Sequence, residues 1–193
     1  MDKFEVEMQH TEESLQALSH MQYDLFCTKN RVVRSVLSLG FVILGVVYFS
    51  HWWGVLAIAY GCYLTTSTYA SANRTAHKLT AQIKAAGTGF PGSRFLFDND
   101  GMHIRPLPEK EGEEELLPYS QFYGLGEDFQ YYYIFRDQYG GYVIPKDKLG
   151  DRENAFRSFV ESKTGRFFRR RRQAPIRRLM QWMKKRENEA YHL

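Results

Sequence analysis

The stretch SVLSLGFVILGVVYFSHWWGVLAIAYGCYLTTSTYASAN, residues 35–73, contains no Asp, Glu, Lys or Arg, although charged residues make up 25% of the chain. A bilayer has a hydrocarbon core of about 30 Å, which a helix of about 20 apolar residues crosses. Because lipid cannot hydrogen-bond an open backbone, each half of the stretch should form a closed helix. The sequence therefore predicts a two-helix transmembrane hairpin over residues 34–73, with its turn at residues 50–54.

Basic residues flank this hairpin at both ends, whereas its turn carries no formal charge. Positively charged flanks favour the cytoplasmic side of a membrane. We therefore expect a two-pass cell-membrane protein with both termini in the cytoplasm. The aromatic residues at the tip suit the headgroup boundary on the other side. The basic flanks are Lys29, Arg31, Arg34, Arg74, Lys78 and Lys84, and the tip aromatics are Tyr48, Phe49, Trp52 and Trp53.

Small residues recur at four-residue spacing on the second predicted span, at Ala57, Gly61 and Thr65. Such a row lets another helix approach closely. We expect the first span to occupy this face, and contact with another protein is the alternative. The sequence leaves the oligomeric state open.

The segments beside the hairpin have helical patterns. Thr11 is a candidate helix cap, followed by two glutamates, and nothing after it forces a break before Arg34. A helical stripe also continues beyond the second span to Gly87. The sequence therefore predicts two helices that extend past the bilayer and pair as a short cytoplasmic stalk. GTGFPG at residues 87–92 matches a dinucleotide fingerprint, but it follows a helix and leads into strand-like sequence, so we interpret it as a hinge.

Residues 94–163 alternate short apolar runs with turn residues, which is typical of an antiparallel sheet. A first hairpin turns at residues 98–101, where Gly101 is expected to take a positive φ. A calcium loop is the alternative reading of the aspartates there, but the expected ligand spacing is missing. A second hairpin turns near Gly140. Asp151 is expected to cap a final helix whose residues Ala155, Phe156, Phe159 and Val160 face the sheet.

Five segments follow from these patterns. They are an N-terminal strand and helix (1–33), the hairpin (34–73), a helical extension and hinge (74–93), an antiparallel sheet with a helix (94–165) and a basic C-terminal helix (166–193). The fold class is α+β.

The C-terminal segment is strongly basic. Residues 166–193 contain ten Lys and Arg against two Glu, and apolar residues follow at helical spacing. A basic amphipathic helix next to a bilayer favours the anionic inner leaflet over nucleic acid. Alternatively, residues 94–163, with a net charge of −5, hold the tail as an internal strap. The expected lipid-surface residues are Arg169, Arg170, Arg171, Arg172, Arg177, Arg178, Leu179, Met180, Trp182 and Met183.

The chain lacks the common catalytic and nucleotide-binding motifs, and its two cysteines and six histidines are scattered. We expect no catalytic residues, no metal and no cofactor. The predicted spans contain no charged residue that would mark a transport path. A group of five tyrosines on the sheet is expected to divide between the core and an exposed contact surface for a protein partner. These are Tyr131, Tyr132, Tyr133, Tyr139 and Tyr142.

Several short motifs resemble the YcxB-like family of bacterial membrane proteins. They are FDNDG (97–101), LPYSQF (117–122), YYYIF (131–135), VIPK (143–146) and the pair Phe156 and Phe159. The resemblance implies a cytoplasmic domain similar to part of a pleckstrin-homology (PH) sheet with its terminal helix. It implies no catalytic residue.

From these features we expect a membrane protein that works by binding, as a regulatory or scaffolding element. The alternative is a membrane-bound enzyme that acts on a lipid or cell-envelope substrate. A deep polar pocket with perturbed carboxylates would favour the enzyme, whereas a shallow aromatic or basic face would favour binding.

Overall fold

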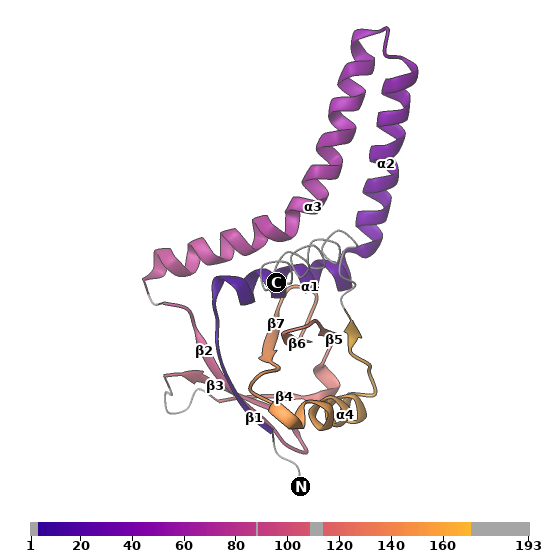
Figure 1. Cartoon of the computed structure of the whole chain (residues 1–193). Helices are drawn as coiled ribbons and strands as arrows, with labels where there is room; N and C mark the ends of the chain where they lie inside the picture. The colour runs from indigo at the N-terminus through magenta and orange to yellow at the C-terminus, as the bar shows by residue number, and fades with distance from the viewer. Residues whose placement is uncertain (1–3, 88, 109–113, 171–193) are drawn as a thin grey trace, which may run out of the picture.

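The computed structural model describes residues 4–87, 89–108 and 114–170, and in this part of the chain it has four α-helices and two four-stranded sheets (Figure 1). The fold is α+β, as predicted. The elements are β1 (Phe4–Gln9), α1 (Glu12–Phe26), α2 (Thr28–Val47), α3 (Trp52–Ala86), β2 (Gly92–Phe97), β3 (Gly101–Leu107), β4 (Glu115–Pro118), β5 (Gly124–Glu127), β6 (Tyr131–Phe135), β7 (Gly141–Pro145), α4 (Glu153–Thr164) and β8 (Arg169–Arg170).

The two sheets enclose an aromatic core. One sheet has the antiparallel order β1-β2-β3-β4, and the other has the order β7-β6-β5-β8, in which only β8 runs parallel to its neighbour β5. The ring of Phe156 on α4 is fully buried among the rings of Phe4, Phe97 and Tyr132. Because β1 pairs with β2, the helices α1 to α3 form an insertion between two adjacent strands of one sheet.

Helix α1 begins as predicted but ends earlier. Thr11 caps it, and the Thr11 and Ser14 side chains each accept a hydrogen bond from the other residue's backbone N–H. The expected continuous helix to the membrane is wrong, because Cys27, with φ −103° and ψ 10°, separates α1 from α2. The physical reason is that α1 buries Met21 against the sheets, whereas α2 is mostly exposed and rises away from them (Figure 1).

Helices α2 and α3 form the predicted helical hairpin. The Ser38 hydroxyl on α2 donates to the Gly61 carbonyl oxygen at 2.7 Å and lies 2.5 Å from the Thr65 hydroxyl. A Cβ atom on Gly61 would lie only 2.8 Å from the Ser38 carbonyl oxygen. The small residues on α3 therefore serve contact within the hairpin, as expected.

Helix α3 continues past the hairpin and bends until it lies along α1 (Figure 1). Within α3, the hydroxyls of Thr66, Thr68, Ser71 and Thr75 each donate to the carbonyl oxygen four residues earlier. Such bonds often bend helices. Beyond the bend, Asn73 accepts hydrogen bonds from α1 side chains, so the predicted stalk is a pairing of α1 with the second half of α3.

Only α2 among the described helices has both the length and the hydropathy to cross a bilayer. Its best window has a mean hydropathy of 1.6 and is 11% buried, so it is not the core helix of the folded domain. The polar run at residues 65–68 lowers the hydropathy of α3. A second span is therefore not established by composition.

The turns of the domain differ from prediction in detail. Gly101 does not have a positive φ; its backbone instead lies so close to β4 that a Cβ atom would meet the Leu117 carbonyl oxygen at 2.4 Å. Asp151 does not cap α4, because it lies in a 3-10 turn and Arg152 occupies the cap position. Ala155 is exposed, whereas Phe156 and Val160 are buried as expected.

Replacing Gly61 with valine is expected to destabilise the full chain in detergent by about 1–3 kcal/mol, because the added atoms overpack the helix contact. Thermal unfolding followed by far-UV circular dichroism measures this change. Gly40→Val is the matched control, since a Cβ atom at Gly40 has no neighbour within 4 Å. Equal melting temperatures for the two variants would contradict the packing described here.

Candidate functional site

An open pocket of about 1000 Å³ lies at the base of the helical hairpin, where α1, α2, α3 and β8 meet. The break at Cys27 creates this pocket, because α2 departs from the end of α1 at a new angle (Figure 1). Its lining residues are Met21, Asp24, Leu25, Phe26, Thr28, Lys29, Arg31, Val32, Ser35, Val36, Leu39, Tyr69, Arg169 and Arg170.

The pocket combines positive charge with an apolar wall. Its four basic side chains, from α2 and β8, face a single carboxylate, Asp24. On α2, Lys29 is followed by Val32, Val36 and Leu39, a spacing that places all four on one helix face. The three apolar side chains are 57–64% exposed. The apolar stripe thus leads from the hairpin down to the basic residues.

One wall of the pocket is held rigidly. Arg31 forms an ion pair with Asp24 at 2.5 Å, and its guanidinium lies 5.3 Å from the centre of the Tyr69 ring. These contacts join the end of α1 to α2 and α3. The Arg31 side chain therefore already has partners within the protein, whereas the side chains of Lys29 and Arg169 are exposed to solvent.

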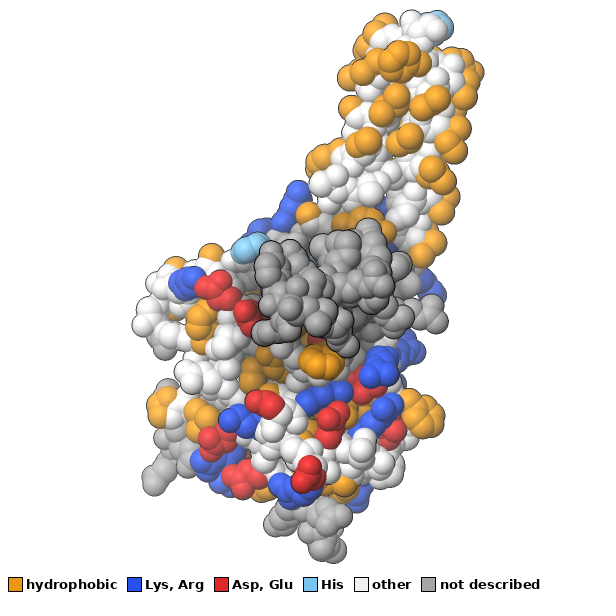
Figure 2. Space-filling view, viewed as in Figure 1, with side chains coloured by type: hydrophobic (Ala, Val, Ile, Leu, Met, Phe, Trp, Pro, Cys, Tyr) orange, Lys and Arg blue, Asp and Glu red, His pale blue; other side chains and the backbone are white. Residues whose placement is uncertain are grey.

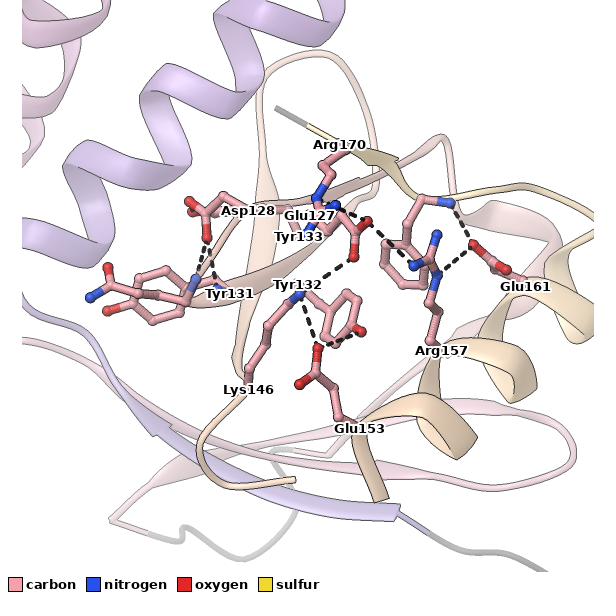
Figure 3. A network of polar contacts seen from close by, with 12 residues as sticks. Glu127, Asp128, Tyr131, Tyr132, Tyr133, Lys146, Glu153, Arg157, Glu161 and Arg170 are labelled. Carbon is pink, nitrogen blue, oxygen red and sulfur yellow. Dashed lines mark hydrogen bonds and ion pairs between the residues drawn. The ribbon is translucent and has the colours of Figure 1, made fainter. Parts of the chain in front are cut away.

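The opposite wall, β8, is fixed by a buried charge network around Glu127 (Figure 3). Glu127 on β5 is 4% exposed, and its carboxylate lies 3.4 Å from Lys146, 3.5 Å from Arg157 and 4.0 Å from Arg170. The strand pairing aligns Arg170 with Glu127. The strand pairing therefore holds the start of the basic C-terminal segment against the domain, and the exposed Arg170 side chain lies at the edge of the charge network.

Contacts just before β8 strengthen this attachment. Phe168 is buried, and its ring centre lies 4.7 Å from that of Tyr132. Its backbone N–H donates to the Glu161 carboxylate at 2.9 Å. The route of the chain from α4 to β8 is thus set by one buried ring and one charge-assisted hydrogen bond.

The second carboxylate of the network, Glu153, is also paired. It accepts hydrogen bonds from the Tyr132 hydroxyl at 3.0 Å and lies 3.1 Å from Lys146. Burial alone would raise the pKa of Glu153, but the hydrogen bonds from Lys146 and Tyr132 outweigh it and hold the pKa below the usual value. Burial, with the bond to Glu153, raises the pKa of Tyr132.

The aspartates of the β2–β3 turn stabilise the turn itself. Asp98 accepts hydrogen bonds from the backbone N–H groups of Asp100 and Gly101, and its other oxygen lies 2.9 Å from His103. Burial alone would raise the pKa of the Asp98 carboxyl group, but the two backbone hydrogen bonds and His103 outweigh burial and lower that pKa.

No group of three or more His, Cys, Asp or Glu that could hold a metal ion occurs within residues 4–87, 89–108 and 114–170.

The structure places two of the ten predicted lipid-surface residues. Arg169 and Arg170 form β8 and line the pocket, and the other eight lie outside the described residues.

The tyrosine group divides as expected, since Tyr132 and Tyr133 are buried and Tyr139 is 78% exposed.

Sequence reasoning missed the contribution of Lys29, Val32 and Val36 to a pocket. It treated residues 28–34 as part of one continuous helix, and only the helix break brings them beside β8. The available signal was the cluster of basic residues at the base of the hairpin.

The chain is therefore an α+β protein with two sheets, in which a long helical hairpin is inserted after the first strand. The model of the YcxB-like protein family matches residues 97–160, from the end of β2 to α4. The resemblance that the motifs predicted is therefore confirmed over these residues, which make up about a third of the chain. No curated protein and no solved structure matches the chain.

Proposed function

We propose that this chain is a two-pass membrane protein whose hairpin holds a PH-like domain beneath the inner leaflet, with both termini in the cytoplasm. Several features support the two spans. Helix α2 has the hydropathy of a span, α3 packs along it, and neither carries a charge between Ser35 and Asn73. Hydrophobic side chains also cover the hairpin surface, while charged side chains gather on the domain (Figure 2).

The PH-like description rests on the arrangement of strands. An antiparallel four-stranded sheet faces a second sheet whose strands β5, β6 and β7 are antiparallel, and α4 closes the core after β7. This is the order of elements in a PH domain. In this chain the helical hairpin replaces the connection between β1 and β2.

The basic pocket carries the proposal that the protein works by binding. A general acid or base needs a pKa near neutral pH, which enzymes obtain by raising that of a carboxyl group. Among the described carboxyl groups, those of Asp98, Glu114 and Glu153 have lowered pKa values, Glu114 mainly through its hydrogen bond from Arg105, and all three lie outside the pocket lining. The proposal of binding therefore rests on the pocket itself, whose apolar wall and exposed basic side chains suit an anionic ligand.

Cysteine labelling tests the topology. In intact cells that produce the chain with Cys27 and Cys62 replaced by serine, Ser50→Cys at the hairpin tip should react with an impermeant thiol reagent. Ser162→Cys on α4 should react only after the cells are opened, because the domain lies on the cytoplasmic side.

Both introduced positions are exposed in the structure, so access to the thiol reflects the side of the membrane. Labelling of both in opened cells is the control. If Ser162→Cys reacts in sealed cells, or if Ser50→Cys reacts only in opened ones, the proposed topology is wrong.

A further inference from the structure

We propose that the pocket at the base of the hairpin binds one anionic glycerophospholipid from the inner leaflet. Its phosphate lies between Lys29 and the β8 arginines, and an acyl chain follows Val32, Val36 and Leu39. This inference rests on the proposed function, because it places the base of the hairpin at the membrane surface.

The dimensions of the pocket fit this ligand. Lys29 and Leu39 are ten residues apart on one helix, a rise of about 15 Å. Over that distance the wall changes from basic to apolar, as a phospholipid changes from headgroup to hydrocarbon. The basic residues come from the first turn of α2 and from β8, and the apolar residues continue along α2 into the hairpin.

The charge of the site selects an anion. Four basic side chains line the pocket against Asp24, and Asp24 is already paired with Arg31. Lys29, Arg169 and Arg170 thus present a surplus of positive charge to any occupant, and Arg170 shares the buried carboxylate of Glu127 with Lys146 and Arg157. A zwitterionic headgroup would bring a positive charge of its own into this field.

The apolar stripe distinguishes a lipid from a soluble anion. Val36 and Leu39 are 64% and 60% exposed on a helix that itself has the hydropathy of a membrane span. Inorganic phosphate would leave these side chains uncovered. An acidic peptide would have to enter the hydrocarbon region, where its backbone groups lack hydrogen-bond partners.

The walls are held before the ligand arrives. Arg31 is fixed by Asp24 and Tyr69, and β8 is fixed by its pairing with β5. A preformed site loses less conformational entropy on binding than a mobile one. A single well-placed lipid can therefore remain bound after the surrounding bilayer is removed.

Native mass spectrometry of the full chain in mild detergent tests the proposal, with phosphatidylglycerol and phosphatidylcholine as probes. The wild type should retain one phosphatidylglycerol in preference to phosphatidylcholine. The double variant Lys29→Gln with Arg169→Gln should weaken retention about tenfold or more, because each basic residue favours an anionic surface. The control, Arg34→Gln with Arg74→Gln, removes equal charge outside the pocket lining and should retain the lipid.

A second pair of variants tests the acyl groove without a change of charge. Val36→Trp fills the groove and should abolish retention, whereas Val33→Trp, equally apolar and 57% exposed but outside the lining, should not. Glycerol phosphate in millimolar excess should fail to displace the lipid. Displacement by glycerol phosphate, or equal loss in both members of either pair, would overturn the proposal.

The cysteine-labelling experiment separates this inference from the proposed function. Correct topology with no preference for phosphatidylglycerol overturns the lipid site alone. Labelling of Ser162→Cys in sealed cells overturns the membrane topology, and with it the reason to expect a lipid in this pocket.

Discussion

Replacing Phe156 with alanine is expected to lower the free energy of unfolding by about 4 kcal/mol, within the range measured for buried phenylalanines. The ring is fully buried and is in contact with Phe97 at 4.9 Å, Phe4 at 5.4 Å and Tyr132 at 5.5 Å between ring centres. These three neighbours come from both sheets, so the cavity would open at the point where the sheets and α4 meet. The loss is a large fraction of the 5–15 kcal/mol that typically stabilises a domain.

Urea unfolding of the full chain in detergent, followed by near-ultraviolet circular dichroism, measures this effect. Tryptophan fluorescence is a poor probe of this core, because Trp52 and Trp53 lie at the start of α3, where they are 77% and 40% exposed. Phe129→Ala is the matched control, since Phe129 is 85% exposed and should change stability by less than about 0.5 kcal/mol. A Phe156→Ala protein as stable as Phe129→Ala would disprove the central position of α4.

The helical hairpin could be predicted because its cause is local. A run of 39 uncharged residues exceeds the length of one span, and the tip sequence marks the turn. The cap at Thr11 was equally visible, because the residues that form it are three positions apart. The pairing of α2 with α3 then followed from the small residues on α3 and the short connection.

The break at Cys27 could not be predicted, because its cause is not local. Periodicity shows that α1 and α2 are helices, but it does not show that Met21 must pack against the β-sheets while α2 rises away. The sequence signal for the bend in α3 was the run of Thr and Ser residues, because such hydroxyls can donate to the carbonyl oxygen four residues earlier and such bonds often bend helices.

The pocket escaped prediction for a related reason. Lys29 and Arg169 are far apart in the sequence, and both line the pocket because β8 pairs with β5 in parallel. A two-residue strand has no sequence pattern of its own. The charge of both segments was evident from the sequence, but their proximity depends on the burial of Phe168 and on Glu127, a single acidic residue in a sheet.

Replacing Glu127 with alanine is expected to destabilise the chain by about 3 kcal/mol, because Lys146 and Arg157 each lose one of their two carboxylate partners. Lys146, whose side chain is 13% exposed, would keep only Glu153 at 3.1 Å, and Arg157 would keep Glu161. These remaining partners place the expected loss at the lower end of the range for breaking a buried ion pair, about 3–5 kcal/mol. Thermal and urea unfolding of the full chain measure it.

The matched control is Glu115→Ala, which removes a carboxylate whose ion pair with Arg136 is half exposed on both sides. Surface pairs of this kind contribute about 0–1 kcal/mol.

Glu127→Ala should also speed tryptic cleavage after Arg166, since β8 loses the carboxylate next to Arg170 and the segment from Arg166 onwards is less firmly held. Unchanged cleavage together with a stability equal to that of Glu115→Ala would mean that β8 is held by its pairing with β5 and by the burial of Phe168, and that the charge network does not fix the basic wall of the pocket.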